Sequence, residues 1–151
     1  MLFRSYEDRG PATQILHAIE KTHGSVYQAI RTKSDADLMR WCLDVTPIVL
    51  KGASENDAVA VQIRNEAAQR LAQTASSAWR AVGKSDADVK ISYTGAVMQD
   101  AGLKEAFAHE LGLLLPHVQW VEPLGDNLDG ALAVARAEQI DIPPLLRWWH
   151  H

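Results

Sequence analysis

The sequence predicts a helix-rich α/β fold with a small, largely parallel sheet. Residues 1–83 repeat their apolar side chains at helical spacing, and in residues 84–140 the pattern changes to strand, helix, strand and helix. The chain has 151 residues, of which 47% are hydrophobic and 23% charged, so it can bury a core of its own. These observations predict a single domain or a domain fragment that ends in a tail at 141–151.

The charge pattern excludes several classes of partner. The formal net charge is −4 and no long run of one sign occurs, so neither nucleic acid nor an anionic membrane surface is an expected partner. No segment approaches the roughly 20 apolar residues that a membrane-spanning helix needs. The N-terminus lacks a signal-peptide pattern, and the lone cysteine, Cys42, gives no sign of an oxidising compartment. We therefore expect a soluble, cytoplasmic protein.

Three short helical segments precede Pro47. The first is expected to end at Gly24, and a second follows it directly. The third begins where Ser34 or Asp35 can cap the free amides of its first turn. Pro47 lacks an amide proton and is expected to interrupt this helix with a kink. Cys42 lies in the apolar stretch before Pro47 and is predicted to be a buried thiol.

The longest helix is predicted at 56–82. Ser54 and Asp57 have the spacing of a capping box at its start, and Gly83 can end it. Small side chains dominate its predicted interior face, which comprises Ala60, Ile63, Ala67, Leu71, Thr74, Ala78 and Val82. Because alanines leave little side chain between two backbones, we expect this helix to pack closely against a neighbouring element.

A strand, a helix, a second strand and a last helix follow, at 89–93, 103–115, 118–121 and 128–139. Two strands joined through a helix fit a right-handed crossover in a parallel sheet. Gly130 and the alanines around it allow the last helix to pack closely. Since two strands alone make a poor sheet, either further strands lie within roughly the first 30 residues or the chain is part of something larger.

Four segments together resemble a known family. They are DRGPAT, SENDAVAVQIRNEAAQRLAQTASSAWRAVG, VKISYTGAV and VEPLGDNLDGALAVA, and they extend over about 8–137. Their order and separation resemble the C-terminal half of the BadF/BadG/BcrA/BcrD-type ATPase and N-acetylglucosamine kinase family, within the sugar kinase, Hsp70 and actin superfamily. Glu7 and Asp8 stand where that family usually has Asp-Gly. The resemblance implies a ribonuclease-H-like, actin-like ATPase fold.

The resemblance also implies a nucleotide site. In the superfamily, ATP lies in a cleft between two domains, and a strand-to-helix turn with a glycine pair lies against the adenosine. The matching residues here are Thr94, Gly95, Ala96 and Val97, with Ala96 in place of the second glycine. A turn that leaves a parallel strand and opens a helix exposes backbone amides at the edge where α/β proteins bind ligands.

Two further positions match the family. The run Asp129-Gly130-Ala131 resembles its Gly-Ala near the last helix, where close packing is the main expected role and nucleotide contact the second. Asn56 and Asp57 stand where the family has Gly-Asp, and Asp57 is expected to cap the long helix.

The sequence lacks the residues that transfer a phosphoryl group. The superfamily's kinases need an N-terminal Asp-x-Gly-x-Thr loop, a second phosphate loop and an acidic residue that orients the acceptor and Mg²⁺. Neither these nor a Walker loop occurs, and no histidine or cysteine has the spacing of a metal site. The chain alone is therefore expected to be inactive, with no catalytic residue and no metal ligand.

Two functions remain open at this point. In the first, the chain is the adenosine-side portion of an ATP-dependent kinase for N-acetylglucosamine or glucosamine, with ATP and Mg²⁺ implied by the family. Its partner is then the missing N-terminal kinase domain or a second copy of the chain. In the second, the chain is a non-catalytic helical interaction module that retains the fold. Nucleotide binding that depends on Gly95 distinguishes the two.

Overall fold

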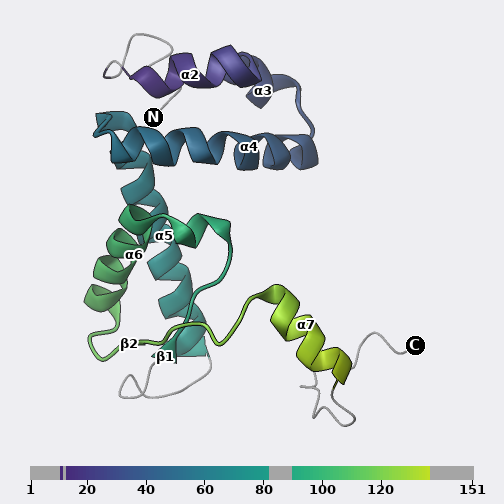
Figure 1. Cartoon of the computed structure of the whole chain (residues 1–151). Helices are drawn as coiled ribbons and strands as arrows, with labels where there is room; N and C mark the ends of the chain where they lie inside the picture. Colours follow the sequence, from purple (N-terminus) through teal and green to yellow (C-terminus); the bar gives the residue numbers. More distant parts are fainter. Residues whose placement is uncertain (1–10, 12, 82–89, 137–151) are drawn as a thin grey trace.

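The computed structural model describes residue 11 and residues 13–81 and 90–136. Helices and a two-stranded parallel sheet occupy these residues, which confirms the helix-rich fold with a small parallel sheet (Figure 1). In chain order the elements are α2 (Gln14–His23), α3 (Val26–Thr32), α4 (Asp35–Ser54), α5 (Ala58–Ala81), β1 (Lys90–Ile91), the 3₁₀ helix η2 (Ala96–Gln99), α6 (Ala101–Leu114), β2 (Gln119–Trp120) and α7 (Asn127–Arg136). The segment at 8–10, the predicted helix end at Gly83 and the tail at 141–151 lie outside the described residues.

The first hydrophobic core lies among α2, α3, α4 and the start of α5. Its buried members are Ile15, Ile19, Val26, Ala29, Trp41, Val45, Val49, Ala53, Val59 and Ala60. The helices α2 and α3 lie on one side of α4 (Figure 1), and the Trp41 indole donates a hydrogen bond of 3.3 Å to the His23 carbonyl at the end of α2. A Cβ atom built on Gly52 would overlap the Ile15 side chain. The glycine therefore lets α4 approach α2 closely.

Local signals end and begin these helices as the sequence predicts. Gly24 ends α2 with φ of 75°, a conformation that favours glycine. Ser34 caps α4, because its hydroxyl oxygen accepts a hydrogen bond from the Asp37 amide at 3.3 Å. At the start of α5, Ser54 does not complete the predicted capping box: its hydroxyl donates to the Lys51 carbonyl, and Asp57 alone caps the helix.

Two predictions about α4 are wrong. The helix continues through Pro47, which is exposed, so the predicted interruption does not occur. Cys42 is exposed and not buried. The core-facing residues of α4 are Trp41, Val45 and Val49, and Cys42 follows Trp41 by one residue, so it is turned away from them.

The buried face of α5 differs from the predicted one. Of the predicted face, Ala60 is buried and Ile63 partly buried, whereas Ala67, Leu71, Thr74 and Ala78 are exposed, and Val82 lies outside the described residues. Towards α6 the helix presents Ala68, Ala72 and Ser76 instead. These side chains are among the smallest on the helix, so they permit the close approach that the alanine content predicts. Alanines occur on both faces, and periodicity alone could not choose between them.

The sheet pairs β1 and β2 in parallel, as predicted. Lys90 lies opposite Gln119 and Ile91 opposite Trp120, and the Val121 amide donates to the Ile91 carbonyl at 3.0 Å. Ile91 and Trp120 pack against the second core, whose buried members are Ala68, Ala72, Leu103, Phe107, Leu111 and Leu115. Each strand has only two residues, and residues 13–32 form helices and their caps, so that part of the chain supplies no strand.

The last helix, α7, does not pack against the sheet as expected. It stands apart from the other elements (Figure 1), and a Cβ atom built on Gly130 would have no neighbour within 4 Å. Leu124 and Leu128 are exposed. Among the described residues, Gly130 therefore has no close packing partner. In the described ranges no helix is long and apolar enough to cross a membrane.

Candidate functional site

The carboxyl ends of β1 and β2 open into two adjoining hollows of about 610 and 540 Å³. Both hollows are lined by Tyr93, Thr94, Pro123, Gly125 and Asp126. We call the two together the strand-end hollow. The segment after each strand forms one wall, because parallel strands bring their carboxyl ends to the same edge of a sheet.

Most of the predicted nucleotide-contacting residues line the strand-end hollow. Thr94 lines both parts, Gly95 and Ala96 line the smaller part, and Asp129 and Gly130 line the larger. Val97 lines neither part. Residues about 35 positions apart in the chain, at 94–96 and 129–130, therefore share one concave surface.

The turn after β1 exposes its backbone. Gly95 has φ of 97°, in the region that favours glycine, and a Cβ atom placed on it would have no neighbour within 4 Å. The amides of Gly95, Ala96 and Val97 donate no hydrogen bond to any described residue, while the Gly95 carbonyl accepts one from Met98 at 3.2 Å. Three consecutive donors are thus open to a ligand or to water. The predicted helix start is displaced: η2 follows the turn, and α6 begins only after Asp100, which caps it.

The acidic residues on the opposite wall have a structural role. The Asp126 carboxylate accepts hydrogen bonds from the amides of Leu128 (2.7 Å) and Asp129 (2.9 Å), and the Asp129 carboxylate accepts one from the Asp126 amide (2.9 Å). This reciprocal arrangement caps α7. With Glu122, these are the charged side chains that line the strand-end hollow among the described residues. The hollow is therefore acidic, which suits hydroxyl donors such as those of a ribose and disfavours free phosphate.

A hydrogen-bonded group joins the two walls. The Lys104 ammonium donates to the Tyr93 hydroxyl at 2.6 Å, and that hydroxyl donates to the Glu122 carboxylate at 2.7 Å. Tyr93 also lies near Trp120, with ring centroids 6.4 Å apart. Sequence reasoning found Tyr93 only as part of the turn and missed Lys104 and Glu122. A signal existed, because Tyr93 and Glu122 each follow their strand by two residues.

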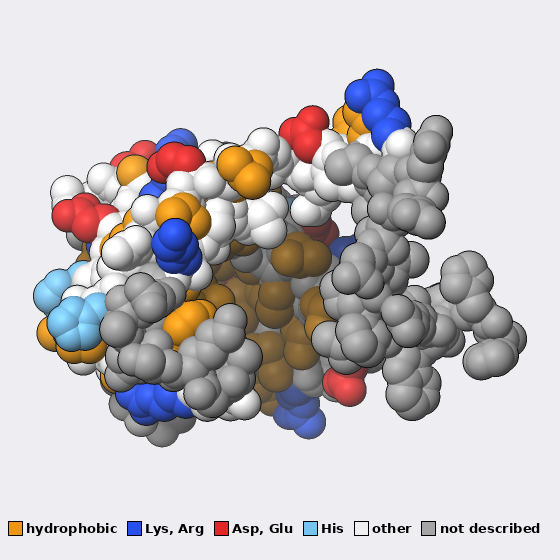
Figure 2. Space-filling view, turned by 90° about the horizontal axis from the view of Figure 1, so that it is seen from below, with side chains coloured by type: hydrophobic (Ala, Val, Ile, Leu, Met, Phe, Trp, Pro, Cys, Tyr) orange, Lys and Arg blue, Asp and Glu red, His pale blue; other side chains and the backbone are white. Residues whose placement is uncertain are grey.

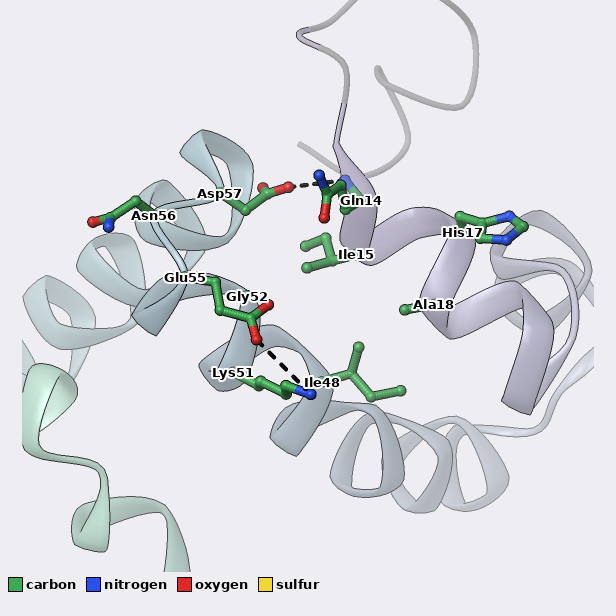
Figure 3. Close-up of a pocket in the computed structure, with 10 residues that line it drawn as sticks. All are labelled: Gln14, Ile15, His17, Ala18, Ile48, Lys51, Gly52, Glu55, Asn56 and Asp57. Atoms are coloured by element: carbon green, nitrogen blue, oxygen red, sulfur yellow. Dashed lines mark hydrogen bonds and ion pairs between the residues drawn. The ribbon is translucent and has the colours of Figure 1, made fainter.

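A third cavity, of about 520 Å³, lies between α2 and the C-terminal end of α4 (Figure 3). Ile15, Ala18 and Ile48 form its apolar centre, and polar side chains surround them. Lys51 and Glu55 form an exposed ion pair across one side at 3.8 Å. The Asp57 carboxylate points towards α2 and is hydrogen-bonded to the Gln14 amide (Figure 3). This wall of the cavity is therefore built around Asp57.

Asp57 caps two helices with one carboxylate. It accepts hydrogen bonds from the amides of Val59 and Ala60 in α5, each 3.0 Å, and from the Gln14 amide in α2, 2.9 Å. The Thr13 hydroxyl, which itself caps α2, lies within 2.9 Å of both carboxylate oxygens. Burial raises the pKa of Asp57, but the hydrogen bonds outweigh it, with the Ala60 amide first, and leave the pKa below its ordinary value. The predicted capping role is confirmed.

Asn56, directly before Asp57, has φ of 63°, in the left-handed region that favours glycine. This is the position at which the resembling family has glycine. The asparagine side chain is one of the few that tolerates this conformation, so Asn56 can form the turn into α5.

The described residues contain no cluster of three or more histidine, cysteine, aspartate or glutamate side chains that could hold a metal ion. His17 and His109 are exposed. No protein-family model, no curated protein and no solved structure matches the chain.

Proposed function

We propose that the chain is the C-terminal, adenosine-side portion of a cytoplasmic ATP-dependent amino-sugar kinase with a ribonuclease-H-like fold. The acceptor would be N-acetylglucosamine or glucosamine. One observation carries the proposal: the turn at 94–96 and residues 129–130, both of which the resemblance relates to the nucleotide, line the strand-end hollow. A ligand crevice at the carboxyl ends of parallel strands is the usual location in α/β proteins.

Three features of the site support a nucleoside as its ligand. The open amides of Gly95 and Ala96, which line the hollow, offer donors to a base or ribose. The acidic wall offers acceptors to ribose hydroxyls and disfavours phosphate, so the triphosphate would extend away from it. The positive φ angles of Gly95 and Asn56 fall at two positions where the family has glycine, which supports the residue-by-residue match.

The proposal assigns no phosphoryl transfer to this chain alone. The 151-residue sequence contains no phosphate loop. Mg²⁺, which the resemblance implies, commonly binds through one or two carboxylates and the phosphates of its ligand, and the described residues contain no cluster of three or more ligating side chains that could hold it alone. Transfer would need a second domain, or a second chain, that supplies the phosphate and metal contacts. The expected property of the chain alone is binding without turnover.

Calorimetric titration of the purified chain with adenosine and with ATP tests the proposal. We expect adenosine to bind at millimolar or lower concentration and Gly95→Val to weaken it by about tenfold or more, since valine is strained at positive φ. Gly112→Ala is the matched control, because Gly112 lies within α6 and has no neighbour within 4 Å of an added Cβ. Wild-type protein that binds neither ligand at millimolar concentration would sink the proposal.

A second candidate, a non-catalytic helical interaction module, is favoured by the exposed apolar side chains. Met39 and Leu43 on α4 are 69% and 63% exposed. Hydrophobic side chains also gather in a recess on the underside of the molecule (Figure 2). Exposed apolar patches often mark protein contacts. This candidate predicts no nucleotide binding, together with association in sedimentation velocity that Leu43→Ser abolishes.

A further inference from the structure

Tyr93 and Glu122 extend the pairing of the two strands beyond its last backbone hydrogen bond. Ile91 lies opposite Trp120, so the same register places Tyr93 opposite Glu122. The last backbone bond joins the Val121 amide to the Ile91 carbonyl at 3.0 Å, and no described backbone bond joins the segments beyond it. Beyond that bond, the Tyr93 hydroxyl donates a side-chain hydrogen bond of 2.7 Å to the Glu122 carboxylate and so links the two segments. It spans the two walls of the strand-end hollow.

Lys104 determines the direction of this bond. An ammonium group has donors only, so the Tyr93 oxygen must accept from Lys104 and direct its own proton to Glu122. Both hydrogen bonds involve a charged partner, which makes them stronger than neutral ones. The Lys104 nitrogen also lies 3.9 Å from the centroid of the Tyr93 ring. Lys104 belongs to α6, so the group ties this helix to the ends of both strands.

The group is well placed to control the hollow. Tyr93 lines both parts and is followed directly by the turn with the open amides. Glu122 lines the larger part and precedes Pro123 and Gly125, which line both. A change in the distance between Tyr93 and Glu122 would therefore move one wall against the other.

We propose that Tyr93, held by Lys104 and Glu122, is a positioning residue that sets the separation of the two walls of the strand-end hollow. The identity of the ligand in this inference rests on the proposed function, but the effect on the walls does not. We call the Lys104–Tyr93–Glu122 hydrogen bonds the bridge. Tyr93→Phe distinguishes the effect of the bridge from that of ring packing, because phenylalanine keeps the ring beside Trp120 and loses both hydrogen bonds.

The experiment compares four variants of the full chain. Tyr93→Phe and Glu122→Ala remove the bridge from either end, and Glu122→Gln retains an acceptor for the tyrosine hydroxyl. Tyr27→Phe is the matched control, since the Tyr27 hydroxyl accepts a hydrogen bond from Arg31 within α3 and Tyr27 does not line the strand-end hollow. Hydrogen–deuterium exchange of the free protein reports on the walls at 92–97 and 121–127, and calorimetry with adenosine reports on the ligand.

We expect exchange in the segment 121–127, where the Val121 amide is bonded to the Ile91 carbonyl, to rise about fivefold or more in Tyr93→Phe and Glu122→Ala, with adenosine affinity about tenfold lower. Glu122→Gln should remain within about twofold of wild type in both measurements, a rescue that general destabilisation would not produce. Unchanged exchange in Tyr93→Phe, or equal effects of Glu122→Gln and Glu122→Ala, would overturn the inference. If exchange responds as expected while wild type binds no adenosine, the positioning role stands and the proposed function fails.

Discussion

The helical half of the described chain, 13–81, and the strand-bearing half, 90–136, differ in how completely they bury their apolar faces. In the first, residues from α2, α3, α4 and α5 enclose one core. In the second, α6 covers one face of the sheet together with α5, which extends into this half from the first. The helix α7 stands apart with exposed leucines (Figure 1). A helix satisfies its own backbone hydrogen bonds, but a two-stranded sheet leaves both edges open. The strand-bearing half therefore gains most from a partner.

The largest expected effect is on the second core. Leu111 is completely buried between α5, α6 and the sheet, so Leu111→Ala should lower the free energy of unfolding by about 3 kcal/mol. Urea denaturation followed by circular dichroism measures this change. Leu113→Ala is the matched control on the same helix, because Leu113 is 67% exposed and should cost less than about 0.5 kcal/mol. Equal effects of the two substitutions would show that α6 packs differently.

The next effect is on the helical half. Asp57→Ala removes the acceptor that caps both α2 and α5, and the loss should be about 2 kcal/mol by the same urea measurement. Asp57→Asn keeps one carbonyl oxygen and should recover part of this. A loss below about 0.5 kcal/mol for Asp57→Ala would mean that the carboxylate does not join the two helices in solution.

The Asp57 cap should also depend on pH. Its pKa is lowered on folding, so its stabilising contribution is complete above the ordinary value of 3.8 and is lost as pH falls through the folded-state pKa. The difference in unfolding free energy between wild type and Asp57→Asn should therefore shrink as the pH is lowered below about 4. Urea denaturation between neutral and acidic pH checks this, and a constant difference would contradict it.

A smaller, stabilising effect is expected at the contact between the two halves. The Ser76 hydroxyl is buried against α6 and has no hydrogen-bond partner among the described residues. Ser76→Ala should raise the unfolding free energy by about 1 kcal/mol, since it removes an unpaired buried polar group. Ser77→Ala is the matched control, because Ser77 is exposed and the substitution changes only helix propensity. It should change the unfolding free energy by less than about 0.5 kcal/mol. A destabilised Ser76→Ala protein would indicate that the hydroxyl has a partner.

The smallest effect is expected on α7. Leu128 is 76% exposed, so Leu128→Ser should change the unfolding free energy by less than about 0.5 kcal/mol. Thermal and urea denaturation of this variant beside wild type measure the difference. A loss of about 2 kcal/mol or more would show that α7 is covered in solution, by a second copy or by another part of the chain.

Sequence reasoning succeeded where a residue acts on its own neighbours. Gly24, Ser34 and Asp57 mark helix ends through bonds within a few residues, and the parallel pairing follows from the strand–helix–strand order. The predicted helix interruption at Pro47 and the predicted burial of Cys42 are wrong, because the exposure of both residues depends on which face of α4 packs against α2. For the candidate site, the turn at 94–96 was expected to lie at a ligand crevice and lines the strand-end hollow, while Lys104 and Glu122 were missed because three separate segments converge there.

The sequence by itself determined the helical character of residues 13–81, the caps at Ser34 and Asp57, the small parallel sheet and the turn with Gly95. Each of these depends on local backbone preference or on apolar periodicity, which are properties of short segments. Only the tertiary structure decided which face of α5 is buried, that α7 is left uncovered and that Tyr93 bridges the strand ends. These outcomes depend on contacts between residues distant in sequence, where several faces compete and close packing selects one.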